Sequence, residues 1–243
     1  MADYGHDPTE TAVPFMAFKD AGFQVSIATE VGKSPKCDAK MLEGITQKLF
    51  GASRSVVSQY SAMSQSPEWT NPTSWSSPAF TLDDFDMVFL PGGHEKSVRQ
   101  VIDASTVHKM LLDFFPKTRK PSNKAVGAVC HGVMVLSQAK GEGGKSVIHD
   151  AVTTTLPGRF EQVAFWGTRA FLGDYYKTYG AGSEDVETSV SVDVLREKKS
   201  CLNLPSSLKV WPPPFLIFSN VGIGDRYETH WMMRVFNSKA VSD

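Results

Sequence analysis

The stretch that decides the fold is Ala125-Val126-Gly127-Ala128-Val129-Cys130-His131-Gly132. An apolar, β-favouring run ends there on a cysteine, and a histidine and a glycine follow at once. The next residues, 133–139, are mostly apolar and predict the opening turns of a helix. A strand that enters a helix through so tight a turn places the turn residue in a strained, exposed conformation, as in a nucleophile elbow.

Cys130 is the residue at this turn, and two interpretations of it stay open. Unpaired backbone N–H groups at the start of a helix favour an anion, so the thiol is expected to ionise more readily than a free cysteine and to act as a nucleophile. Free cysteine is also among the most buried residue types, which makes packing behind the sheet a competing role. The adjoining His131 and Gly132 favour the nucleophile.

The composition is that of an ordinary globular protein: 243 residues, 41% hydrophobic and 21% charged, with a formal net charge of −1. Such a balance gives no attraction to nucleic acid, and no apolar run approaches the roughly 20 residues that span a bilayer. The three cysteines are widely separated and lack metal-ligand spacing, so we expect neither a metal site nor a disulfide framework. A reducing, cytoplasmic location is therefore expected.

Strand and helix patterns alternate along the chain. Helices are predicted at 13–21 (with Pro14 in the first turn), 41–49, 98–102 and 106–115, and strands at 24–29, 85–90, 125–129 and 152–155. Continuously apolar strands that alternate with helices predict an α/β fold with a parallel sheet sandwiched by helices. A Ser-rich segment, 53–80, interrupts this order and is predicted to be a lid-like insertion.

Two loops that follow predicted strands carry the candidate chemistry, because open parallel sheets bind ligands beyond the carboxyl ends of their strands. Gly92, Gly93 and His94 follow one strand, and the Cys130 turn follows the next. The amides of Gly93 and His131 are candidates for an oxyanion hole, with a plain Gly-Gly turn as the alternative.

Two further side chains are candidates for proton transfer. His131 is a candidate base or substrate-orienting residue, and His94 has similar status, with more weight on a packing role. Glu161 is a candidate carboxylate partner for His131, and a solvated helix charge is an equally good interpretation of it.

Taken together, these pieces resemble the ThiJ/PfpI superfamily, also called the DJ-one superfamily, whose flavodoxin-like fold is similar to that of the class I glutamine amidotransferases. The resemblance extends from about residue 3 to about residue 187. Cys-His-Gly combined with Pro-Gly-Gly-His is similar to the larger branch, which contains stress-inducible chaperones and glyoxalase III enzymes. The matching segments are Pro8-Thr9-Glu10-Thr11, Leu90-Pro91-Gly92-Gly93-His94, Ala128-Val129-Cys130-His131-Gly132 and Thr153-Thr154-Thr155-Leu156-Pro157.

The resemblance implies roles for four residues: Cys130 as the nucleophile, Glu10 as the acid beside it, His131 as the adjoining base and Glu161 as its orienting group. It implies glutathione-independent conversion of a 2-oxoaldehyde such as methylglyoxal to a hydroxy acid, with no cofactor. Glu10 must then be protonated, because an ionised carboxylate would raise the pKa of the cysteine. A small-molecule substrate and a possible homodimer are the implied partners.

The chain departs from the family at both ends. Members begin with an apolar strand near the sheet centre, and this usual first strand is expected to be lacking here, which leaves two rows of unpaired backbone groups. The family-like α/β domain is expected to span 1–195, followed by a divergent tail, 196–243. Within that tail, 215–218 is expected to pair into the sheet.

Three other functions stay open at this point. One is an isonitrile hydratase or amide hydrolase of the same fold, whose site chemistry would be nearly the same. Another is a non-catalytic stress chaperone or redox sensor, in which Cys130 is oxidised without turnover. The last is a degenerate relative that binds a partner through its apolar tail.

Overall fold

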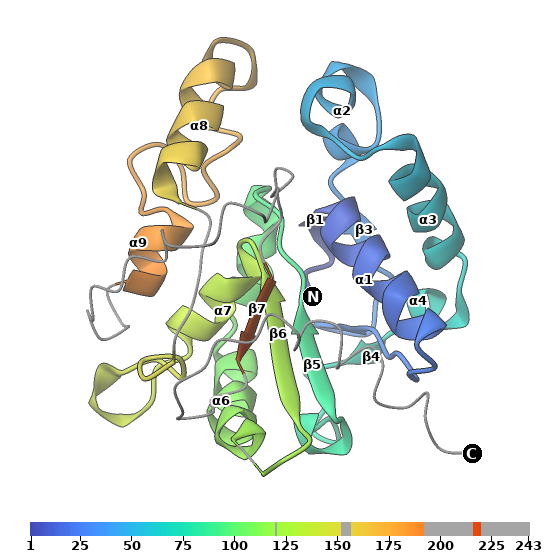
Figure 1. Cartoon of the computed structure of the whole chain (residues 1–243), viewed down its shortest axis with the longest axis vertical. Helices are drawn as coiled ribbons and strands as arrows, with labels where there is room; N and C mark the ends of the chain where they lie inside the picture. Colours follow the sequence, from blue (N-terminus) through green and yellow to red (C-terminus); the bar gives the residue numbers. More distant parts are fainter. Residues whose placement is uncertain (120, 152–156, 192–215, 220–243) are drawn as a thin grey trace, which may run out of the picture.

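The computed structural model describes residues 1–119, 121–151, 157–191 and 216–219. Strands within these ranges form three small sheets, and helices lie on both sides of the longest of them (Figure 1). The first sheet pairs β1 with β3, the second pairs β2 with β4, and the third has the order β5-β6-β7. The strands are β1 (Tyr4–His6), β2 (Ala28–Thr29), β3 (Lys36–Cys37), β4 (Thr73–Ser74), β5 (Met87–Leu90), β6 (Ala125–Val129) and β7 (Leu216–Ser219).

The helices divide into two groups around the β5–β6 pair. In Figure 1, α1 to α4 lie on one side of these strands and α7 to α9 on the other, which confirms the predicted α/β architecture. The helices are α1 (Pro8–Asp20), α2 (Gly44–Phe50), α3 (Arg54–Ser64), α4 (Pro67–Thr70), α5 (Arg99–Ile102), α6 (Ser105–Phe114), α7 (Gly132–Gln138), α8 (Gly158–Leu172) and α9 (Val186–Ser191). None of the described helices is both long and apolar enough to cross a membrane.

The β5–β6 pair is the part of the sheet that positions the cysteine turn. The two strands are parallel, in a register that runs from Met87 opposite Ala125 to Leu90 opposite Ala128. Val126 and Ala128 are almost fully buried and pack in the main hydrophobic core together with α6 and α7. The sequence predicts both strands correctly, because continuous apolar runs are typical of parallel strands covered on both faces.

On its other edge, β6 pairs with a strand from the far end of the chain. β7 runs antiparallel to β6, with Ile217 opposite Ala128 and Leu216 opposite Val129. Pairing of the predicted segment into the sheet is thus confirmed for residues 216–218. The rest of the tail and the strand predicted at 152–155 lie outside the described residues.

Helix α1 begins five residues earlier than predicted, and the reason is its cap. The Asp7 side chain accepts the backbone N–H groups of Thr9 and Glu10, at 2.7 and 3.1 Å. Such a cap satisfies the free donors of the first turn and fixes the helix start at Pro8. Pro14 therefore lies inside the helix, and its prediction as a first-turn residue is wrong.

The strand predicted at 24–29 is also shorter than expected. Only Ala28 and Thr29 pair, with β4. Among the described residues β5 pairs with β6 alone, and β1 pairs with β3 rather than with β5. No described strand pairs with the edge of β5 that faces residues 22–28.

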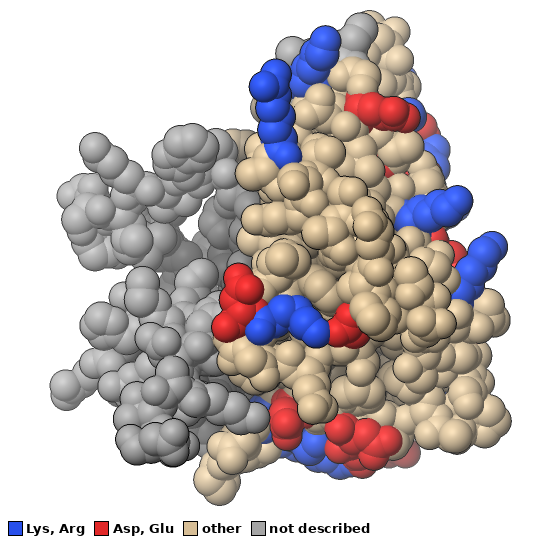
Figure 2. Space-filling view, turned by 90° about the vertical axis from the view of Figure 1, so that its right-hand side faces the viewer, with Lys and Arg blue, Asp and Glu red and all other residues tan. Residues whose placement is uncertain are grey.

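The segment 53–80, predicted as a lid-like insertion, folds as α3, α4 and β4. Tyr60, Met63 and Trp69 from this segment are buried in a second core cluster with Ala12 and Phe15 of α1. Figure 2 shows the side of the molecule on which these helices lie, and uncharged side chains cover most of its centre. The segment thus supports α1, the helix that carries Glu10.

Candidate active site

Cys130 has the strained backbone that the sequence predicts for an elbow. Its φ is +51°, and it is the one non-glycine residue with positive φ among those described. A conformation of this kind costs about 1–3 kcal/mol and persists only where the surroundings impose it. The close contact at the next turn residue but one, Gly132, is part of these surroundings. A Cβ at Gly132 would lie 2.2 Å from the Leu90 carbonyl oxygen, so only glycine allows α7 to begin against β5.

Glu10 reaches the same place from α1. The Asp7 cap fixes the first turn, and the Asp7 N–H donates to the carbonyl of Gly92 at 3.0 Å, which ties the helix start to the loop after β5. A Cβ on Gly92 would lie 2.6 Å from Glu10 Oε2 and 2.8 Å from Cys130 Cβ. The Glu10 carboxyl and the Cys130 side chain therefore approach each other at Gly92, which has no side chain to separate them.

Burial raises the pKa of Glu10 well above its usual value of 4.5, and the neighbouring Asp7 carboxylate raises it further. The Cys130 thiol and the Gly92 N–H oppose that shift only in part. Glu10 Oε2 has no hydrogen-bond partner of normal geometry among the described residues. The site thus favours the protonated acid that the mechanism requires.

The Cys130 thiol departs from expectation. Burial, then the Glu10 and Asp7 carboxyls, raise its pKa well above the usual 9.0, and the His131 backbone N–H offsets this in part. The predicted lowering of the pKa is therefore wrong: desolvation outweighs the helix start. The sulfur therefore carries its proton at rest.

His131 is placed to take that proton. Its Nδ1 lies 3.2 Å from the Cys130 sulfur. Burial, together with the charge of Lys177, lowers the pKa of His131 from 6.5 to about 4, so the ring is neutral at physiological pH. In the tautomer protonated on Nε2, Nδ1 is an acceptor and the pair is a thiol with its base.

The glycine loop leaves a donor available. Gly93 has a φ of +138° and packs against the backbone of residues 5–7, where a side chain would clash with Gly5 O. Its N–H donates to no carbonyl or side chain within the described ranges. Gly93 therefore keeps the candidate oxyanion role, whereas the Gly92 N–H is directed at Glu10 and the His131 N–H at the sulfur.

His94 lies in the same region, in an aromatic setting. Its ring stacks on Tyr176 and meets Tyr175 edge-on, with both centroids 4.5 Å away. Burial, then the nearby His131, lowers the pKa of His94 from 6.5 to about 3. Nε2 of this neutral ring is buried without a hydrogen-bond partner among the described residues.

Glu161 is not hydrogen-bonded to His131. Its Oε1 accepts the Val186 N–H at 3.0 Å, and its Oε2 lies 3.8 Å from Nζ of Lys177. Lys177 is buried, and its charge acts on both His131 and Glu161. Glu161 is therefore linked to His131 only through the charge of Lys177, and not by a direct hydrogen bond.

Lys177 is the residue that the sequence interpretation missed. A signal for it exists in Tyr175-Tyr176-Lys177, where a lone lysine adjoins two aromatic residues. Lysine is rarely buried without a functional or paired role. No motif in the resemblance contains this position, so nothing directed the search to it.

Metal binding has no visible site in the described part of the chain. No three His, Cys, Asp or Glu side chains within it come together in a way that would hold an ion. Glu10 and His131 both lie near Cys130, but each is used there as a protonated acid and a neutral base.

The fold and this site define a protein with a nucleophile-elbow cysteine on an α/β sheet. A family model described as ThiJ/PfpI family-like matches residues 1–201, and the chain belongs to that family. Two uncharacterized Schizosaccharomyces pombe proteins, C14C4.04 and C18G6.12c, are each 27% identical, over 140 and 176 residues. The matches cover 57% and 67% of this chain and 52% and 55% of the relatives, so the chain spans about half the length of the curated relatives it matches.

Solved structures share the fold. A crystal structure named APC35852 aligns with a TM-score of 0.51 and 20% identity, over 78% of this chain and 71% of that one. The Rapid Encystment Protein 24 KDa of Francisella tularensis aligns at 0.49 with 18% identity, over 79% of each chain. At such identities the likeness concerns architecture alone.

Proposed function

We propose that this protein is a Cys130-dependent enzyme that converts a reactive 2-oxoaldehyde such as methylglyoxal to a hydroxy acid without glutathione. The observation that carries the proposal is the convergence of a strained thiol, a neutral histidine 3.2 Å from its sulfur and a buried acid over Gly92. Family membership supports the architecture of such a site but not its substrate.

The proposed reaction begins with attack of sulfur on the aldehyde carbon. As the S–C bond forms, the thiol proton moves to Nδ1 of His131, and the carbonyl oxygen takes up negative charge. The Gly93 N–H stabilises that oxygen, and Glu10, protonated at rest, then gives it a proton, which produces the hemithioacetal and leaves Glu10 as a carboxylate. His131 is neutral at rest and can accept that proton, but its lowered pKa makes it a weak base, so the proton has to move as the S–C bond forms.

The second half moves a proton between two substrate carbons. The hydrogen on the former aldehyde carbon leaves as a proton, and the neighbouring ketone carbon gains one, so the hemithioacetal becomes the thioester of a 2-hydroxy acid. Glu10, left as a carboxylate once it has protonated the oxygen, takes the carbon-bound proton and returns it to the neighbouring carbon, while the hydroxyl proton passes by way of His131 to the ketone oxygen. Water then cleaves the thioester, which releases the hydroxy acid and restores the thiol.

The experiment is consumption of methylglyoxal and formation of lactate by the purified chain without glutathione. We expect Cys130→Ala to abolish turnover and Cys37→Ser to retain it, because Cys37 is buried in the core cluster with Tyr60 and Met63 of α3, apart from Glu10 and His131. Equal activity of Cys130→Ala and the parent chain would refute the proposal.

Two alternative functions can be distinguished with the same purified protein. An isonitrile or amide hydrolase would use the same groups, so a substrate panel distinguishes it. A peroxide sensor needs a thiolate at rest, and the raised pKa of Cys130 argues against that use. The homodimer implied by the resemblance and the cytoplasmic location expected from the cysteines stay predictions, to be checked by light scattering and by fractionation.

A further inference from the structure

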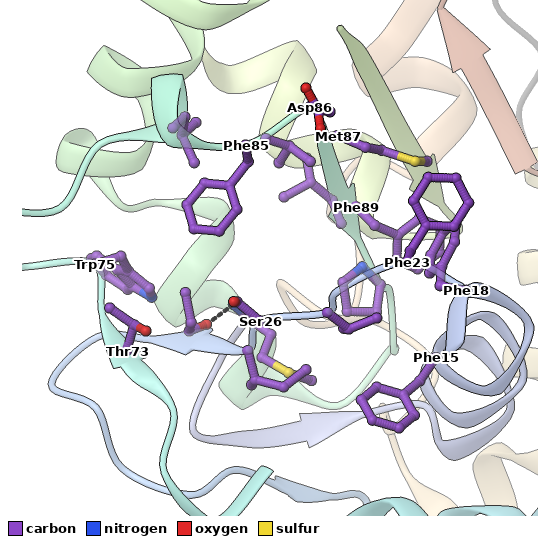
Figure 3. A pocket seen from close by; sticks show the side chains of 18 of the residues that line it. Phe15, Phe18, Phe23, Ser26, Thr73, Trp75, Phe85, Asp86, Met87 and Phe89 are labelled. Atoms are coloured by element: carbon purple, nitrogen blue, oxygen red, sulfur yellow. Dashed lines mark hydrogen bonds between the residues drawn. The ribbon is translucent and has the colours of Figure 1, made fainter. Parts of the chain in front are cut away.

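The outer face of α8 is an apolar surface that contacts solvent. It differs from the cavity of about 480 Å³ beside β5, whose aromatic side chains surround a hollow in the molecule (Figure 3). The described residues expose seven large apolar side chains, and four of them belong to α8, with exposed fractions between 54% and 70%. These four residues, which define the outer face, are Phe160, Val163, Trp166 and Phe171.

Helical spacing separates this face from the one that holds α8 in place. The buried residues of the helix recur every three or four positions, at Gly158, Glu161, Phe165 and Thr168. That period places them on one side of a helix, and the outer-face residues lie on the other. In Figure 1, α8 lies at the edge of the molecule, on the side of the β5–β6 pair away from α1 to α4. The inner face therefore anchors the helix, and the outer aromatic rings are left in water.

Two arginines border the outer face. The Arg159 guanidinium lies 5.6 Å from the centroid of the Phe160 ring, and that of Arg169 lies 5.1 Å from the Trp166 ring. These cation–π contacts hold both charges beside the rings. Neither arginine forms an ion pair with a carboxylate among residues 1–119, 121–151, 157–191 and 216–219. Ten helical residues separate the two charges, which is about 15 Å along the axis.

We propose that the outer face of α8 is a docking surface for an amphipathic helix of a partner protein, whose apolar stripe is flanked by carboxylates about three turns apart. The rings of Phe160, Trp166 and Phe171 pack on that stripe, because tryptophan and arginine contribute most to the binding energy of interfaces. Arg159 and Arg169 each pair with one carboxylate, which fixes the register of the partner helix. Packing of an amphipathic helix through its apolar side is a common mode of recognition.

The charges favour this partner over two other occupants. A second copy packed through α8 would bring arginines together without carboxylates, because the one acidic residue of α8, Glu161, is buried on the inner face. An anionic bilayer attracts a broadly basic face. Here the exposed Glu187 accepts the Gly158 N–H at 2.6 Å, and Glu184 is exposed in the same segment. Both carboxylates would oppose a flat anionic surface at this end of α8.

The test is titration of the full chain into a fluorescently labelled, sixteen-residue helical peptide, followed by anisotropy. The peptide carries a leucine stripe and two glutamates about ten positions apart. We expect saturable binding that weakens as salt is added. The matched control is the same peptide with glutamine in place of both glutamates, and its affinity should fall at least about threefold.

Variants of exposed residues give an independent check. Arg159→Glu combined with Arg169→Glu should weaken binding of the glutamate peptide about tenfold and favour a lysine version of it, whereas Arg54→Glu on α3 should change neither. Trp166→Ser should also weaken binding at least about tenfold. Val31→Ser is its control, because Val31 is 67% exposed and lies outside α8. An unchanged Tm in each variant shows that the fold is retained.

Several outcomes would overturn the proposal. No saturable binding of the glutamate peptide would do so, and equal binding of the glutamine peptide would identify a general apolar surface. Dimerisation, or binding to phosphatidylserine vesicles, that Trp166→Ser abolishes would assign the face to a second copy or to a membrane. Peptide binding that requires removal of residues 220–243 would assign it to the chain's own tail.

Discussion

Two cysteine–histidine pairs in this protein each have a buried histidine, but they differ in backbone, in partners and in the exposure of the cysteine, since Cys37 is buried and Cys130 is partly exposed. Cys37 lies in β3 and His6 in β1, and the Tyr60 hydroxyl bonds both: it accepts the Cys37 N–H at 2.8 Å and lies 3.2 Å from His6 Nε2. At the other pair the Cys130 sulfur contacts His131 directly, and its backbone is in the left-handed region.

Burial shifts the pKa values of both pairs in the same directions. It raises the pKa of each thiol and lowers that of each histidine, to about 3 for His6 and about 4 for His131. A shifted pKa therefore does not distinguish a reactive pair from a packed one. Backbone strain, together with access to the sulfur, does so here, because the structure stabilises that strain only at Cys130.

The largest expected effect tests whether the acid beside Cys130 moves a proton. Glu10→Gln keeps the shape and a donor, but it can no longer give up and regain a proton. We expect kcat for methylglyoxal to fall about 10²–10⁴-fold with KM little changed, measured by steady-state kinetics. A kcat within a few-fold of the parent value would show that Glu10 is only a packing residue, like those around His6.

Gly92→Ala should come next in size. A Cβ at this position overlaps Glu10 Oε2 and Val129 O, both at 2.6 Å, so the acid and the elbow must move apart. Because a misplacement of about 1 Å can cost 10²-fold, we expect a loss of at least that size in kcat/KM. Gly167→Ala in α8 is the control: no atom lies within 4 Å of its Cβ, and alanine favours the helix. Equal losses in both variants would contradict this explanation.

Lys177→Met tests the role of Lys177, which the sequence analysis missed, through the pH dependence of kcat/KM. The lysine charge lowers the pKa of His131, so its removal should raise that pKa and move the acid limb of kcat/KM upward, by up to about one pH unit. Met retains the length and the burial. Lys96→Met, at an exposed ion pair with Asp174, should leave the limb in place. An unchanged limb in Lys177→Met would reduce the lysine to a packing role.

The smallest expected effect concerns the Cys37–His6 pair and the stability of the fold. In the unfolded chain His6 gains a proton near pH 6.5, whereas in the fold it stays neutral down to about pH 3. The unfolded state binds more protons in that window, so His6 lowers the free energy of unfolding as pH falls. Between pH 6 and 5 the parent chain should lose about 1 kcal/mol relative to His6→Phe in urea titrations. A constant difference would show that His6 is already protonated in the fold.

The elements that the sequence predicts correctly have local signals. The elbow strand, its helix, and α5 and α6 each carry an uninterrupted apolar period, and the strained Cys130 follows from a strand that meets a helix without a loop. Glu10 is found only through the resemblance, because nothing in Pro8-Thr9-Glu10 by itself indicates a site.

The missed features depend on contacts between distant segments. The start of α1 rests on the Asp7 cap, and the short β2 rests on the position of β4. The pKa of Cys130 is the clearest case: the helix start favours a thiolate, but two buried carboxyls and desolvation decide otherwise. Lys177 reaches the site from a loop 47 positions beyond the cysteine, a distance that no local pattern encodes.

The pairing of β6 on both edges has a consequence for motion. Its amides pair with β5 on one side and with β7 on the other, whereas half of those in β5 face an edge at which no described strand pairs. In hydrogen exchange, β6 should open only with global unfolding and Met87 and Phe89 much sooner. The turn that carries the Cys130 sulfur thus follows the strand expected to exchange most slowly. Local opening at the other edge of β5 should therefore leave the geometry of this turn unchanged.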